Sequence, residues 1–106
     1  MIELIELGGN IRLSGFKELE PAMLIVVKKM VGNYTKKISE RVKGFQDINI
    51  NLKKIHEKSH EIQVKLNAEK VYNSDVTDHN LFFALDKALG KIMNEVEKFR
   101  LNRIKY

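Results

Sequence analysis

The 106-residue chain is 43% apolar, so it can form one hydrophobic core and is expected to be a single domain spanning 1–106. Its formal charge of +5 favours a polyanionic partner such as nucleic acid, although a very soluble Lys-rich domain would show the same balance. It contains no Cys, which excludes disulfides, thiolate metal sites and thiol nucleophiles, and it has no apolar run close to the ~20 residues that span a bilayer.

The chain opens with two short apolar segments, residues 2–7 and 11–16, separated by a Gly-rich turn. The second segment alternates apolar and polar residues, which predicts a strand. In the first segment apolar residues fall on both faces, so it is either a strand covered on both sides or one that bulges or pairs with a second chain. Such an N-terminal strand would allow a homodimer to form. Because the chain starts with the acidic Glu3 and Glu6 and lacks a basic-then-apolar export signal, we expect a cytoplasmic protein.

Residues 21–42 are predicted to form the first helix. Pro21 suits the first helical turn, and Gly44 can adopt the left-handed conformation that often ends a helix. Gly32 interrupts the pattern at mid-length, which indicates either a close backbone approach or a bend. Apolar residues recur at intervals of three and four along this segment: Leu24, Val27, Val31, Tyr34, Ile38 and Val42.

The middle of the chain switches to a period of two. Alternation over residues 47–53 and 61–68 predicts two half-buried antiparallel strands, and 71–76 predicts a shorter third strand. Because each strand and each helix has one apolar face, the simplest packing is an α+β fold. In this fold an antiparallel sheet of three to five strands carries both helices on one face and leaves the other face polar. If Tyr72 lies on that polar face, it could stack on a base.

Residues 81–102 are predicted to form the second helix, with Asp78 or Asn80 as its N-terminal cap. The apolar side of this helix consists of Phe82, Leu85, Leu89, Ile92, Val96 and Phe99. Its opposite side carries a line of Lys residues that extends about 27 Å at ~1.5 Å per residue. Because an ordinary solvated helix face mixes charges of both signs, this line favours an anionic partner.

A similar line of Lys residues at heptad spacing follows the first predicted helix. With both helices on one face of a sheet, the two lines would share one solvent side at the usual helix separation of about 10 Å and resemble a phosphate-binding face. Lys contacts of this kind position a nucleic-acid backbone and do not read its sequence. The candidate nucleic-acid-binding residues are Lys29, Lys36, Lys43, Lys87, Lys91, Asn94, Lys98 and Lys105.

The last third of the chain contains a group of motifs that is found in one family: Asn67-Ala68-Glu69, Phe83-Ala84-Leu85-Asp86, Lys91-Ile92 and Lys98-Phe99-Arg100. With these residues the chain resembles the ribosome hibernation-promoting factors, also called ribosome-associated inhibitors; the first two-thirds agree in the order of elements only. The resemblance implies a β-α-β-β-β-α domain related to the double-stranded-RNA-binding fold. It also implies a ribosomal partner and no catalytic activity.

His56-Glu57-Lys58-Ser59-His60 matches the H-E-x-x-H pattern of zinc metalloproteases. That pattern binds metal only on a helix, where the two His side chains lie one turn apart. Here it connects two segments of strand periodicity, so we expect a solvent-exposed hairpin loop without a stoichiometric metal. No nucleophile elbow or Gly-rich phosphate loop is present either, and we expect no catalytic residue, metal site or cofactor.

These patterns support two functions. The first is a non-catalytic RNA- or ribosome-binding module that uses the two Lys lines. The alternative is a structural or protein-interaction domain that self-associates through residues 2–7. Salt dependence separates them, because the release of counterions from several phosphates makes RNA binding fall steeply as salt rises.

Overall fold

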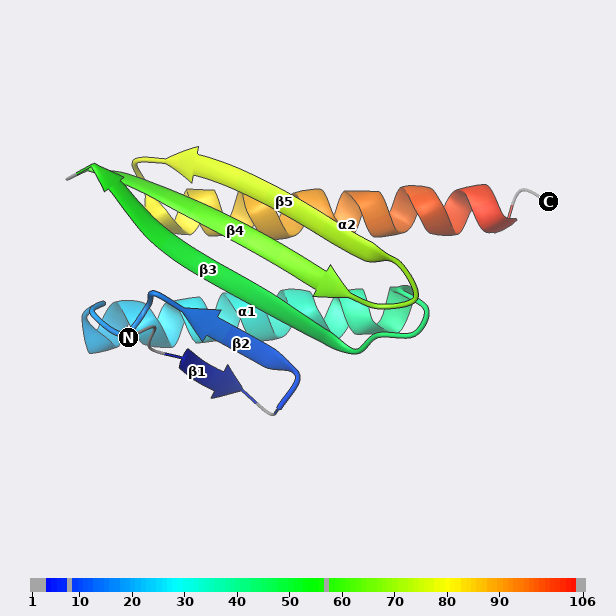
Figure 1. The fold of residues 1–106 in the computed structure, drawn as a ribbon, viewed down its shortest axis with the longest axis horizontal. Coiled ribbons are helices and arrows are strands. Elements are labelled where there is room, and N and C mark those ends of the chain that lie inside the picture. Colours follow the sequence, from blue (N-terminus) through cyan, green and yellow to red (C-terminus); the bar gives the residue numbers. More distant parts are fainter. Residues whose placement is uncertain (1–3, 8, 57, 105–106) are drawn as a thin grey trace.

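In the computed structural model, which describes residues 4–7, 9–56 and 58–104, a five-stranded sheet carries two helices on one face (Figure 1). The strands lie in the order of the sequence, β1-β2-β3-β4-β5. Their bounds are Leu4–Leu7 for β1, Ile11–Ser14 for β2, Asp47–His56 for β3, Ser59–Asn67 for β4 and Val71–Asp78 for β5. The helices are α1, Pro21–Arg41, and α2, Leu81–Ile104. Both helices therefore lie within two residues of the predicted bounds.

The sheet is mixed, because β2 and β3 pair in parallel while the other neighbours pair antiparallel. The chain leaves β2, crosses the sheet face as α1 and returns as β3, and a crossover of this kind brings the next strand back in the same direction. The predicted α+β fold with both helices on one face is confirmed. The prediction of a wholly antiparallel sheet is wrong at this one pair.

The core lies between the sheet and the two helices. Alternate residues of the long strands point into it, including Ile48 and Ile50 of β3 and Val64 and Leu66 of β4. Tyr72 is also part of this core, with only 4% of its surface exposed. Tyr72 therefore does not lie on the polar sheet face, and the condition for stacking a base there is not met. Its position in β5 has the same parity as that of the buried Val76, so both side chains point towards the helices.

The first helix runs without a break through Gly32. A Cβ atom added there would meet nothing within 4 Å, so no neighbouring backbone requires this glycine. The helix ends at Arg41, and Gly44 has a φ of 72°, in the left-handed region expected for a residue that terminates a helix.

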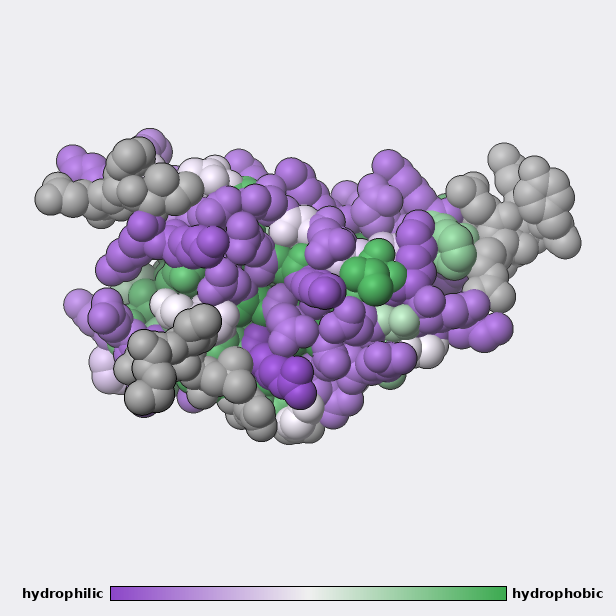
Figure 2. All heavy atoms as spheres, viewed as in Figure 1, coloured by the Kyte–Doolittle hydropathy of each residue, from purple (hydrophilic) through white to green (hydrophobic). Residues whose placement is uncertain are grey.

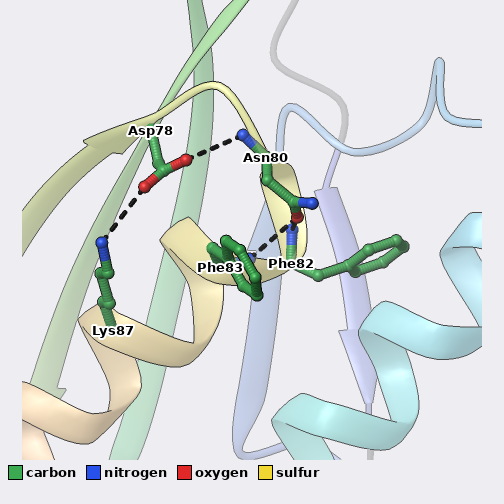
Figure 3. Close-up of polar contacts among 5 residues, drawn as sticks. All are labelled: Asp78, Asn80, Phe82, Phe83 and Lys87. Atoms are coloured by element: carbon green, nitrogen blue, oxygen red, sulfur yellow. Dashed lines mark hydrogen bonds and ion pairs between the residues drawn. The ribbon is translucent and has the colours of Figure 1, made fainter.

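Asn80 is the N-terminal cap of α2, which decides between the two candidates (Figure 3). Its side-chain oxygen accepts hydrogen bonds from the backbone N–H groups of Phe82 at 2.9 Å and Phe83 at 3.1 Å. Asp78 supports this turn from outside the helix, because one carboxylate oxygen accepts the Asn80 N–H at 2.9 Å and the other lies 3.2 Å from the Lys87 amine. These bonds, first that from Asn80 and then that from Lys87, lower the pKa of Asp78.

The two helices run side by side in the same direction and are joined at two polar contacts (Figure 1). The Tyr34 hydroxyl donates to the Asp86 carboxylate at 2.6 Å, and Arg41 Nε lies 2.8 Å from Glu97 Oε1. Burial, together with the hydrogen bond to Asp86 and its charge, raises the pKa of Tyr34 to about 12. Neither helix, over its described residues, is long and apolar enough to cross a membrane.

Candidate nucleic-acid interface

A groove lies between α2 and β5, which is an edge strand of the described sheet, and it contains three of the predicted binding residues. Lys91, Asn94 and Lys98 are exposed and line one wall of the groove, which has a volume of about 580 Å³. Residues at 70–75 form the other wall, and among them Lys70 adds a third amine. Asp75 and Glu95 also line the groove, so it carries three ammonium groups against two carboxylates.

Helical geometry explains why these side chains share one wall. Residues 91, 94 and 98 follow one another at steps of three and four, so they lie on one side of α2. The buried Ile92 and Val96 hold the adjacent side of the helix against the sheet. Packing of the apolar stripe therefore turns the Lys line towards the β5 edge.

Two other members of the predicted α2 line differ from these three. Lys87 is exposed, but its amine lies 3.2 Å from Asp78, so part of its charge is already compensated (Figure 3). Lys105 lies outside the described residues.

Two members of the α1 line, Lys29 and Lys36, lie on the opposite flank of the helix layer. Lys29, Lys36 and Lys43 are exposed. Tyr34 marks the side of α1 that contacts α2, and Lys36 is two residues further on, roughly 200° around the helix. On α2 the contact side is marked by Asp86, and Lys91 is five residues further on, roughly 140° around. Lys29 and Lys36 consequently point away from the Lys line of α2 and do not share one surface with it. Lys43, which follows the end of α1, instead lines a hollow next to α2.

The sheet face without helices is mainly polar, with some apolar surface between the polar side chains (Figure 2). A chain of hydrogen bonds crosses three strands there, from the Ser14 hydroxyl to Asn51 at 2.8 Å and from the Asn51 amide to Gln63 at 3.2 Å. Next to it, a hydrogen bond to Asp75 raises the pKa of Glu61, with smaller contributions from burial and the Asp75 charge. By strand parity, Arg12, Lys53 and Lys65 also lie on this face, among the carboxylates of Asp47, Glu61 and Asp75.

Among the described residues of the H-E-x-x-H match, His56, Ser59 and His60 lie in strands and not in a helix. β3 ends at His56 and β4 begins at Ser59, so the connection is shorter than predicted and His60 is the second residue of β4. The expected loop position is therefore wrong for His60, whose Nδ1 lies 3.0 Å from the backbone oxygen of His79. The side chain of His56 lies outside the described residues. Within the described part of the chain, no group of three or more His, Cys, Asp or Glu side chains could hold a metal ion.

A second, smaller hollow was missed by the sequence reasoning. It lies next to the groove, where the end of α1, the turn before β5 and the second half of α2 meet, and it is lined by Arg41, Lys70, Phe99 and Arg100 among others. The one signal in the sequence was the basic-aromatic-basic run Lys98-Phe99-Arg100, which identified the helix ending and gave no indication of a concave surface.

No protein-family model matches the chain, and a search of the curated proteins found no match. Among solved structures, the crystal structure of the Protein Y N-terminal domain from Thermus thermophilus is similar, with a TM-score of 0.60 and 15% sequence identity over 77% of this chain and 87% of that one. The structure of a ribosomal subunit interface protein from Coxiella burnetii is also similar, with a TM-score of 0.57 and 12% identity over 87% of this chain and 96% of that one. At these identities the likeness establishes a shared fold.

Proposed function

We propose that the chain is a non-catalytic RNA-binding module that associates with the ribosome, and that the groove between α2 and β5 holds the RNA backbone. The observation that carries the proposal is the common wall formed by Lys91, Asn94 and Lys98, faced by Lys70 across the groove. Amines spaced along a groove neutralise successive phosphates, and the Asn94 amide adds a neutral donor of the kind that often contacts a backbone.

The fold agrees with this function. A protein with this arrangement of strands and helices is a ribosomal subunit interface protein in Coxiella burnetii, and the motifs of the last third resemble the hibernation-promoting factors. Because one fold hosts many functions, the residues of the groove and not the fold decide the proposal.

Binding of a fluorescent RNA hairpin at several salt concentrations tests the proposal. A steep fall in affinity with rising salt is expected, and the double variant Lys91→Gln, Lys98→Gln should reduce the slope by about two units, one for each lost phosphate contact. Cosedimentation with purified ribosomes at low and physiological salt then tests the partner. Absence of RNA binding at low salt would rule out the module.

Self-association through the N-terminal strand remains the alternative function, because β1 is the other edge of the described sheet and an edge strand offers unpaired backbone groups to a second chain. Ile5 and Leu7 of β1 pack partly against the core. Sedimentation velocity over a wide range of protein concentrations tests this alternative, and a monomer at every concentration would exclude it.

A further inference from the structure

The small hollow beside the groove combines an apolar floor with a basic rim. Its volume is about 240 Å³. Its lining consists of Arg41, Val42, Lys43, Glu69, Lys70, Tyr72, Val96, Phe99 and Arg100. Sites for drug-sized ligands measure ~300–1,000 Å³, so this hollow suits a smaller planar group.

Aromatic rings present their faces to this hollow. The Lys70 amine, which lines the hollow, lies 4.8 Å from the centroid of the Phe99 ring and 5.3 Å from that of Tyr72, over both rings. These distances are those of cation–π contacts. Tyr72 and Val96 are almost fully buried and form a fixed base, whereas Phe99 is half-buried and accessible from the hollow.

The rim carries an excess of positive charge. Arg41, Lys43, Lys70 and Arg100 contribute four cations. Glu97 compensates part of this charge, because its two oxygens lie 2.8 Å from Arg41 Nε and 3.6 Å from an Arg100 nitrogen. Glu69 adds the second carboxylate, which leaves two more cations than anions around an aromatic floor.

From this geometry we propose that the hollow binds one nucleotide unit, with its base stacked on Phe99 and its phosphate on the basic rim. The base takes the place of the Lys70 amine, which is on a long, exposed side chain and can turn towards the phosphate. Any base can stack on an aromatic ring. The site therefore recognises the aromatic face and the phosphate charge of a nucleotide and does not distinguish one base from another.

This inference rests on the proposed RNA-binding function, since the hollow and the groove share Lys70 and Tyr72. Because the two sites adjoin at these residues, we expect a strand whose backbone follows the Lys wall of α2 to reach the hollow. The same chemistry would also accept a free nucleotide, and the two sources are separated by the probes below.

Titration of the full chain with AMP, ribose 5-phosphate and inorganic phosphate, followed by isothermal calorimetry or NMR, tests the site. AMP should bind roughly 5- to 150-fold more tightly than ribose 5-phosphate, because only AMP has a base to stack. Phe99→Leu should weaken AMP binding by roughly 5- to 150-fold, the range measured for loss of one stacking platform. Equal affinity for AMP and ribose 5-phosphate, or an unchanged affinity in Phe99→Leu, would overturn the proposal.

Thermal melting of Phe99→Leu shows whether the variant is folded, and the exposed variants Lys70→Gln and Arg100→Gln provide a second readout. Both variants should weaken the binding of AMP and of inorganic phosphate alike. Loss of stacking alone would not weaken the binding of inorganic phosphate. If neither changes AMP affinity, the rim does not hold the phosphate and the proposal fails.

The double variant Lys91→Gln, Lys98→Gln separates the nucleotide site from the proposed RNA-binding function. The variant should bind AMP as the parent does and bind the RNA hairpin less tightly. AMP binding without any hairpin binding would refute the RNA module alone, and hairpin binding without AMP binding would refute the nucleotide site alone. A tetra-adenylate that binds more than ten-fold tighter than AMP, and loses this gain in the Lys variant, identifies an RNA strand as the source; equal affinities identify a free nucleotide.

Discussion

The hydroxyl of Tyr34 on α1 donates a 2.6 Å hydrogen bond to the carboxylate of Asp86 on α2. This bond joins the facing sides of the two helices. It therefore identifies how each helix is rotated about its own axis. With that rotation, the Lys line of α2 faces the β5 edge, and Lys29 and Lys36 of α1 face the opposite flank. The contact between Tyr34 and Asp86 therefore shows on which side of each helix the Lys residues lie.

Removal of this hydrogen bond should make a modest difference to stability that depends on pH. Tyr34→Phe should lower the free energy of unfolding by about 1 kcal/mol at pH 7, the usual value of one hydrogen bond. Because the pKa of Tyr34 is raised to about 12 in the folded state, from about 10 for a free tyrosine, the bond contributes fully below pH 10 and its contribution is lost as pH rises towards 12.

Urea unfolding of both proteins from pH 8 to 11.5 measures this effect, and the difference between them removes the contribution of Lys deprotonation. The difference should be constant up to about pH 10 and then shrink. A difference that stays constant over the whole range would show that Tyr34 does not donate to Asp86.

The cap of α2 should be a local determinant of stability of similar size. Asn80→Ala removes the acceptor of the Phe82 and Phe83 N–H groups and should cost about 1 kcal/mol. Asn80→Ser, which keeps an acceptor at the cap, should retain most of the stability. Denaturant unfolding distinguishes them, and equal losses in the two variants would contradict the assignment of Asn80 as the cap.

Gly15, which follows β2, should tolerate no side chain. Its φ is 83°, and a Cβ atom there would overlap the backbone carbonyl oxygen of Leu52 on β3. Gly15→Ala is therefore expected to destabilise the fold by more than the ~1 kcal/mol that the left-handed conformation alone costs. Gly32→Ala is the control, since a Cβ there meets nothing within 4 Å and alanine has the higher helix propensity. A Gly15→Ala protein as stable as the parent would show that the close approach is absent.

Much of the fold was predictable because the local patterns are strong. Alternation in β3 and β4 and the three-and-four spacing of both helices are visible in the sequence, and the sites of burial follow from them. The parallel pairing of β2 with β3 was not predicted, because it depends on where α1 places the returning chain. The sheet face of Tyr72 was left open because β5 is polar on average, and the parity of its few apolar residues carries the only signal.

The candidate site was predictable only in part, for a related reason. Helical spacing identifies which Lys residues share a side of α2, but it does not say which element lies beside that line. The contribution of Lys70 and the adjacent hollow depends on residues about 30 positions apart in the chain meeting in space, as Lys70 and Phe99 do at 4.8 Å. Likewise, the separation of Lys29 and Lys36 from the Lys line of α2 follows from a contact between residues 34 and 86.

The central claim is that the groove between α2 and β5, and not basic charge in general, holds RNA. Two double variants with the same change in charge test it: Lys91→Gln, Lys98→Gln in the groove, and Lys29→Gln, Lys36→Gln on the far flank. Both pairs are exposed and outside the core, so each variant should unfold within about 1 kcal/mol of the parent. The measurement is the slope of log affinity for the RNA hairpin against log salt concentration. The groove variant should lose about two units of slope and bind far more weakly at physiological salt, while the flank variant keeps the parent slope. Equal losses of slope in the two variants would contradict the claim, and so would a groove variant that keeps the slope of the parent.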